Sequence, residues 1–132
     1  MSGKWACASI RISSKDKTCT EVTKILGIDP TSFHAKGSLI YKKSSTYRKE
    51  SLWILDSGIS DDNKLEMHVD KLVVLIRGKK AAFKRLLRLK CEVELFLGFS
   101  SENGQGSYRL SSFNIGVLSE VRGISVLFDL YP

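Results

Sequence analysis

Residues 65–99 read LEMHVDKLVVLIRGKKAAFKRLLRLKCEVELFLGF, and the change of periodicity within them decides the fold. In the first part, apolar residues recur every three or four positions, which is the period of an amphipathic helix with one buried stripe. That stripe comprises Leu65, Val69, Leu72, Val73, Ile76, Phe83, Leu86 and Leu87. After Cys91, apolar residues alternate as in a strand with one buried face, at Val93, Leu95, Leu97 and Phe99. The stretch therefore predicts a long helix followed by a strand.

Gly78 lies where the predicted helix cannot continue unchanged. Continuing the helical period would turn Lys79 into the core. A glycine costs about 1 kcal/mol in a helix interior, and a buried unpaired lysine would cost more. We therefore expect a kink or break near Gly78 and Lys79. The helix should begin at about Lys64, because Asp61 and Asp62 then lie near its positive N-terminal end.

The residues before this stretch predict a strand, a short helix, a loop and a second strand. Residues 6–12 alternate apolar with other residues, as a first strand would. Thr18 and Glu21 have the spacing of a capping box, and Gly27 supplies the stop of the helix that follows. Residues 31–49 predict a long loop that can carry short strands. Leu52–Leu55 is apolar at every position, so both faces of this strand would be apolar, which favours a central strand.

The residues after this stretch predict a hairpin, a helix and a last strand. Ser101–Gly106 is typical of a turn, which would let Ser107–Leu110 pair back on the preceding strand. Ser111 or Ser112 can cap a helix that stops at Gly123. In the last strand, Ile124, Val126, Phe128 and Leu130 share the predicted inner face. We expect residues 1–132 to form one α+β domain, a mainly antiparallel sheet with helices packed on one face, related to the ferredoxin-like arrangement.

Composition narrows the class of protein. Hydrophobic residues make up 42% of the chain and only two residues are proline, as in a domain with one core. Apolar runs such as residues 72–76 are far shorter than the ~20 residues of a membrane helix, and Met1–Ile10 lacks the apolar core of a secretion signal. We therefore expect a cytoplasmic protein that does not contact a membrane. Cys7, Cys19 and Cys91 are odd in number and widely spaced, which predicts reduced thiols rather than disulfides or a zinc site.

The net charge of +7 is concentrated in residues 77–90. Seven cations and no acid occur there, whereas the other fourteen Lys and Arg residues are matched in number by the fourteen Asp and Glu residues. On a helical wheel, Arg77, Lys80, Lys84 and Arg88 form a stripe opposite the buried one, and Arg85 lies at its border. Such a run is usually a solvated helix end. The alternative is a docking surface for an acidic or anionic partner.

A second candidate surface lies on the sheet. Side chains alternate between the two faces along a strand, and this alternation places three apolar residues on the face opposite the predicted helices: Phe96, Leu127 and Tyr131. If the sheet is open on that side, they form an apolar patch suited to protein contact. The alternative is that residues 31–49 cover them.

Catalytic patterns are weak in this chain. His34 and His68 are too few and too isolated to form a metal site, and HExxH, phosphate-loop and nucleophile-elbow motifs are absent. We expect His68 to lie at the border of the buried stripe. No local signature supports a dyad of Cys19 with His34. We therefore expect neither an enzyme nor a cofactor.

Several segments together resemble the bacterial family catalogued as domain of unknown function 4279. They are the first strand, EVTKILGIDPTSFHAKG at 21–37, LWILDS at 52–57, LEMHVDKLVVLI at 65–76 and ISVLFDLYP at 124–132, which span nearly the whole chain. The resemblance implies no catalytic motif. The family is similar in size and layout to small single-domain proteins that act as immunity partners in bacterial toxin systems. The run 77–90 is more basic than the family pattern.

The first hypothesis for function is a non-enzymatic protein-binding module, namely an immunity protein that neutralises a cognate toxin domain by occlusion. Arg77, Lys80, Lys84 and Arg88 would meet acidic groups on the toxin, and aromatic residues of the sheet would supply buried anchors. The alternative is a small basic nucleic-acid-binding protein. It is the weaker of the two because no RNP motif, KH loop or recognition-helix pattern accompanies the charges.

Overall fold

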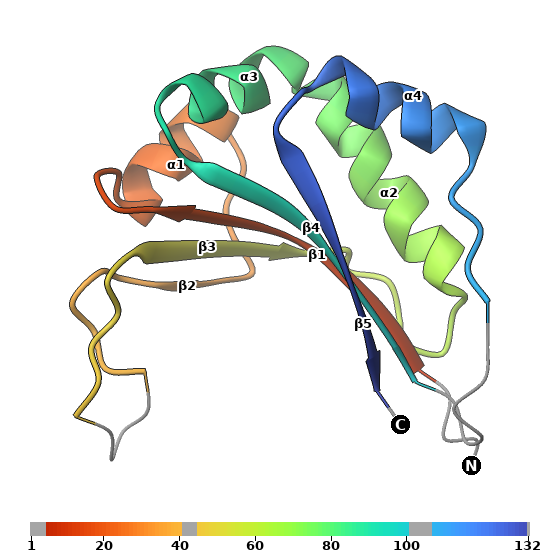
Figure 1. Ribbon diagram of the computed structural model, residues 1–132, viewed down its shortest axis with the longest axis horizontal. Coiled ribbons are helices and arrows are strands. Elements are labelled where there is room, and N and C mark those ends of the chain that lie inside the picture. The colour runs from red at the N-terminus through yellow and green to blue at the C-terminus, as the bar shows by residue number, and fades with distance from the viewer. Residues whose placement is uncertain (1–4, 41–44, 101–106, 132) are drawn as a thin grey trace.

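The computed structural model describes residues 5–40, 45–100 and 107–131. Within them the strands form one sheet in the order β2-β3-β1-β4-β5. The helices lie together on one face of this sheet (Figure 1). In chain order the elements are β1 (Trp5–Ser14), α1 (Cys19–Leu26), β2 (Ser32–His34), β3 (Ser51–Asp56), α2 (Leu65–Gly78), α3 (Lys80–Arg88), β4 (Glu92–Ser100), α4 (Ser112–Glu120) and β5 (Ile124–Tyr131).

The connections explain this strand order. The pairs β2–β3, β3–β1 and β1–β4 are all antiparallel, and α1 and α2–α3 connect them in the split βαβ pattern of ferredoxin-like folds. β5 is added beside β4 and runs parallel to it. A parallel neighbour needs a crossover, and α4 provides it. The predicted α+β class, with a mainly antiparallel sheet and helices on one face, is confirmed.

The core lies between the sheet and the helices. The predicted inner faces of the first and fourth strands are confirmed, since Ile10, Ile12 and Leu95 are at most 1% exposed. They pack with the buried stripe of α2 and α3, in which Val69, Ile76, Phe83 and Leu86 are fully buried. Trp53 of β3 is also in the core, and its indole Nε1 donates to Thr23 Oγ1 of α1 at 3.0 Å.

The predicted break in the long helix is confirmed. α2 ends at Gly78 and α3 begins at Lys80, with Lys79 between them at φ −121° and ψ 25°. The Lys79 ammonium reaches the C-terminal end of α1, where its Nζ lies 3.5 Å from the position that a Cβ on Gly27 would occupy. A cation is favourable at that end of a helix. The break therefore lets Lys79 leave the core and reach this end of α1.

Other local signals are confirmed as well. Thr18 and Glu21 form the capping box of α1, and Gly27 ends that helix at φ 71°. Ser111 caps α4 by accepting from the Asn114 amide. The long loop carries β2, and an isolated bridge joins Leu39 to Tyr47.

The predicted hairpin after β4 is wrong. Ser107–Leu110 is not a strand, and the neighbour of β4 on that side is β5. Tyr108 and Leu110 instead pack against the core, where the Tyr108 ring lies 6.2 Å from the Phe128 ring. The eight-residue pairing with β5 takes the edge of β4 that the hairpin would have used. The predicted turn 101–106 lies outside the described residues.

In the last strand, the predicted residues share the helix-packed face of the sheet, but they are not buried as predicted. Register places Val126 beside Leu95 and Phe128 beside Leu97, on the helix-packed face. Val126 and Phe128 are nevertheless 46% and 45% exposed, because β5 forms the edge of the sheet.

The three cysteines, all in the described part, are free thiols, as predicted. No helix among the described residues is long and apolar enough to cross a membrane.

Candidate functional site

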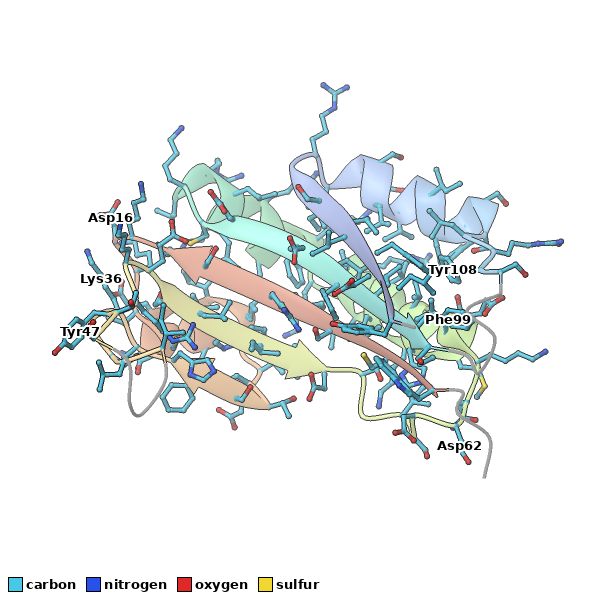
Figure 2. The ribbon with its side chains drawn as sticks, turned by 60° about the horizontal axis from the view of Figure 1, so that its bottom comes forward. Asp16, Lys36, Tyr47, Asp62, Phe99 and Tyr108 are labelled. Carbon is cyan, nitrogen blue, oxygen red and sulfur yellow. The ribbon has the colours of Figure 1, made fainter. Side chains whose placement is uncertain are left out.

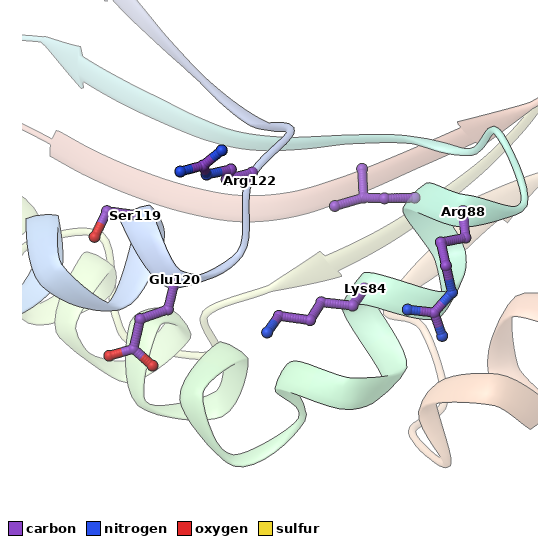
Figure 3. Close-up of a pocket in the computed structure, with 6 residues that line it drawn as sticks. Lys84, Arg88, Ser119, Glu120 and Arg122 are labelled. Carbon is purple, nitrogen blue, oxygen red and sulfur yellow. The ribbon is translucent and has the colours of Figure 1, made fainter.

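Two cationic residues of α3, Lys84 and Arg88, line a cleft. Burial of Phe83 and Leu86 turns Lys84 and Arg88, which are one turn apart, towards α4. The cleft has a volume of about 500 Å³. It is lined by Lys84, Leu87, Arg88, Ser119, Glu120 and Arg122, and we call these residues the basic cleft. Figure 3 shows its two sides, with Lys84 and Arg88 on α3 and the other labelled residues at the end of α4 and just after it.

Glu120 is the one acid that lines the basic cleft, and it is already engaged. Its carboxylate pairs with the Lys80 ammonium of α3. This hydrogen bond, with the charges of Lys80, Lys84 and Arg77, lowers the pKa of Glu120. Lys84, Arg88 and Arg122 form no ion pair within the described ranges. The cleft therefore presents three unpaired cations beside one neutralised pair.

The predicted basic stripe lies along the boundary between α4 and the two helices α2 and α3. The Arg77 guanidinium carbon lies 5.5 Å from the ring centre of Phe113 on α4. Lys80 pairs with Glu120, and Lys84 and Arg88 line the cleft. Arg85 is exposed but is not among the residues that line it.

Two further residues join this surface that the sequence did not indicate. Arg122 follows α4 and lines the cleft. Phe113 stands two turns before Glu120 on the same face of α4 and is 49% exposed. Neither belongs to the run 77–90, and only the packing of α4 beside α3 brings them there.

The second candidate surface is the sheet face opposite the helices. Figure 2 looks onto this face, which the helices leave uncovered, with Lys36 and Tyr47 at one end of the sheet and Phe99 at the other. Leu127 is 46% exposed and Tyr131 is 38% exposed, so the described part of the loop 31–49 does not cover them. The Tyr131 ring lies 5.1 Å from the ring of Trp5, a neighbour that the sequence did not indicate.

Phe96 differs from the other two residues of the predicted patch. It is only 7% exposed, and the Arg11 guanidinium carbon lies 3.8 Å from the centre of its ring. Arg11 comes from the adjacent strand β1, so a cation of the same sheet face covers the phenyl ring. The structure therefore brings Leu127 and Tyr131 to the surface but not Phe96.

A serine and a histidine contact each other inside the molecule. Ser57 Oγ lies 2.7 Å from His68 Nδ1, and these residues are 4% and 1% exposed. Burial lowers the pKa of His68, against the opposing effects of the Ser60 and Asn63 backbone and of Asp61. His68 is thus buried rather than at the border of the stripe. A substrate in solvent has no access to either side chain.

The Cys19 thiol lies against the backbone of His34, and no hydrogen bond joins it to the His34 imidazole among the described residues. The Cys19 thiol lies 3.8 Å from the backbone carbonyl of His34 and 3.5 Å from that of Leu52. Burial raises the pKa of the thiol, which makes it a poor nucleophile at neutral pH. Among the described residues, no group of three His, Cys, Asp or Glu side chains is placed to hold a metal ion.

A family model described as Domain of unknown function (DUF4279) matches residues 4–132, which is nearly the whole chain. No curated protein and no solved structure matches the chain.

Proposed function

We propose that this chain, which belongs to the DUF4279 family, is a non-enzymatic module that binds a protein partner with an acidic surface. The observation that carries the proposal is the basic cleft, where Lys84, Arg88 and Arg122 stand together without an ion pair in the described part of the chain. Neighbouring like charges repel each other, and an acidic partner relieves that repulsion. A concentrated charge also speeds association and orients the partner.

The shape of the charged surface favours a protein over a single small anion. Lys80 and Arg88 stand at the two ends of α3, about 12 Å apart along a helix. The exposed Phe113 ring extends the surface onto α4 beside Arg77. Aromatic and arginine side chains are the residues that most often dominate protein interfaces. An acidic protein surface with an apolar site for Phe113 therefore fits this arrangement best.

A non-enzymatic role is supported by the state of the reactive groups. Ser57 and His68 contact each other but are shielded from solvent. The pKa of the Cys19 thiol is raised by burial, and the thiol faces backbone carbonyls rather than an imidazole. None of these groups lines the basic cleft.

In its most specific form, the proposal is a cytoplasmic immunity protein that binds a cognate bacterial toxin domain and blocks it by occlusion. This form is supported by the similarity of the family in size and layout to immunity proteins. The cleft would contact acidic groups of the toxin and set its orientation, and the body of the sheet and helices would exclude the toxin's substrate.

The test is charge reversal in the cleft. The double variant Lys84→Glu/Arg88→Glu should weaken binding to a candidate toxin domain, chosen because the wild type protects cells that express it, by at least tenfold and mainly through slower association. A matched control is Lys24→Glu/Lys49→Glu, which makes the same charge change at exposed positions on α1 and in the loop before β3. Equal affinity of the cleft variant and the control would reject the cleft as the contact. Failure of the wild type to protect cells that express the toxin, at a demonstrated excess, would reject the immunity role.

The second candidate function is nucleic-acid binding, in which the same three unpaired cations would contact phosphate groups. Three or four phosphate contacts with duplex DNA predict a slope of roughly −2.7 to −3.6 for log affinity against log salt concentration. A flat dependence between low and moderate salt would exclude this function. A slope in that range for RNA or DNA, without binding to an acidic protein, would favour it over the first.

A further inference from the structure

The two edges of the sheet are protected to very different degrees. β2 is a three-residue edge strand, whereas β5 has eight residues and pairs with β4 along its whole length. Natural edges are usually kept short, bent by a bulge, or marked by lysine or proline. Residues 124–131 contain neither lysine nor proline, and Asp129 is their one charge. In the part of the chain that the structure describes, no strand pairs with the outer edge of β5, so this long regular edge is open to pairing.

The side chains of β5 are apolar on both faces of the sheet and half exposed. Val126, Phe128 and Leu130 on the helix-packed face are 45–51% exposed, although the Tyr108 ring stacks near Phe128. On the other face, Leu127 and Tyr131 are 46% and 38% exposed. At about 150–250 Å² for a large accessible side chain, these fractions amount to roughly 400 Å² per chain. This area is about half of the ~800 Å² per partner of a standard interface.

We infer that β5 pairs antiparallel with β5 of a second copy of this chain, about a two-fold axis at Leu127. In such a pair, opposed residues point to the same face of the sheet, so the helices of both copies lie on one side of a continuous sheet. Val126 then lies opposite Phe128, and Asp129 lies opposite Ser125. The strand is thus complementary to itself: apolar residues face apolar residues on the helix-packed face, and on the other face Leu127 meets Leu127 while Asp129 meets a polar residue.

The charge on β5 disfavours two of the neighbouring registers. An axis at Asp129 would place two carboxylates opposite each other, which destabilises a sheet. An axis at Phe128 would place Asp129 against the apolar side chain of Leu127. The axis at Leu127 avoids both contacts. Leu127 and Tyr131, expected from the sequence to contact a partner, become contacts between copies.

This inference goes beyond the proposed function and does not depend on it. The residues of the basic cleft lie outside β5, so charge reversal in the cleft and substitution in β5 test different surfaces. The modest area predicts a weak dimer that dissociates on dilution.

The experiment is sedimentation equilibrium from low micromolar to several hundred micromolar protein, in enough salt to screen the net charge. The wild type should rise from the monomer mass of 14.8 kDa towards twice that value. Leu127→Lys places two cations at the axis and should weaken association at least tenfold. Ile115→Lys is the matched control, because Ile115 is similarly exposed, at 52%, but belongs to α4 rather than to β5. A wild type that stays monomeric throughout, or a Leu127→Lys variant that associates like the control, overturns the inference.

A cross-linking test covers the case in which Leu127→Lys does not fold. Directly opposed residues of antiparallel strands have Cα atoms about 4.5–5.5 Å apart, which is within disulfide range. Mild oxidation should link Leu127→Cys into a dimer but should not link Val126→Cys, which faces Phe128 of the other copy. The wild type, with Cys7, Cys19 and Cys91, is the control for incidental links. Equal linking of the two variants, or none with Leu127→Cys, overturns the inference. A monomer whose β5 instead binds a strand of another protein overturns it as well.

Discussion

Ser57 Oγ and His68 Nδ1 lie 2.7 Å apart and are both buried. Ser57 follows β3, where its amide donates to the carbonyl of Ala8 at 3.0 Å, and its hydroxyl accepts from the Ile59 amide at 3.2 Å. His68 belongs to the first turns of α2. The pair therefore joins the end of a strand to the start of the central helix.

The stability of the fold should depend on pH through His68. Burial lowers its pKa in the folded state below the ordinary value of 6.5. As the pH falls below about 6.5, the unfolded chain takes up a proton before the folded one does, so the free energy of unfolding decreases. Above that pH the full stability is present. Urea denaturation at pH 7.5 and at pH 5.5 should show the loss. His68→Gln should reduce it, whereas the matched His34→Gln should retain it. If both variants lost the same unfolding free energy between pH 7.5 and pH 5.5, His68 would not be the source of the pH dependence.

Removal of the Ser57 hydroxyl should destabilise the fold by about 1–3 kcal/mol, because Ser57→Ala leaves a buried ring nitrogen without its partner. Denaturant titration at pH 7.5 measures the change. Ser60→Ala, at an exposed position of the same connection, is expected to stay within about 0.5 kcal/mol of the wild type. A Ser57→Ala variant as stable as Ser60→Ala would show that the contact is dispensable.

The indole of Trp53 should report on its bond to Thr23. Trp53 is 1% exposed, and its Nε1 donates to Thr23 Oγ1 at 3.0 Å. Thr23→Val keeps the side-chain shape but removes the acceptor, so the free energy of unfolding should fall by about 1–3 kcal/mol. Thr20→Val on the same helix is exposed and serves as the control. Unfolding followed by tryptophan fluorescence and by circular dichroism would check the result, and a loss shared by both variants would argue against the bond.

Two glycines should respond to alanine with opposite signs. A Cβ on Gly98 of β4 would lie 2.7 Å from Cys7 Sγ of β1, so Gly98→Ala should cost about 1–3 kcal/mol. A Cβ on Gly116 of α4 would meet nothing within 4 Å, so Gly116→Ala should stabilise by about 0.5–1 kcal/mol. Combining Gly98→Ala with Cys7→Ala should recover much of the loss, as a double-mutant cycle would show. No recovery in that cycle would mean that the crowding at Gly98 comes from other neighbours.

Features that depend on neighbouring residues could be predicted. The capping box of Thr18 and Glu21, the break at Gly78 and the alternating faces of β1 and β4 all follow from local hydrogen bonding and from the period of burial. The same reasoning identified Lys84 and Arg88 as outward-facing cations, because Phe83 and Leu86 had to turn inward.

Pairings between distant segments could not be predicted in this way. Ser107–Leu110 was expected beside β4, but β5 occupies that edge after the α4 crossover. Phe96 has the parity of an exposed residue, yet Arg11 of the neighbouring strand covers it.

Sequence patterns were therefore enough to place the helices, the buried faces of β1 and β4 and the concentrated charge, because periodicity and caps act within a few residues. Only the tertiary structure decided that Arg122 and Glu120 complete the basic cleft and that β5 forms an open apolar edge. These features depend on which strands pair and where α4 packs, and that choice is made by burial summed over residues far apart in the chain.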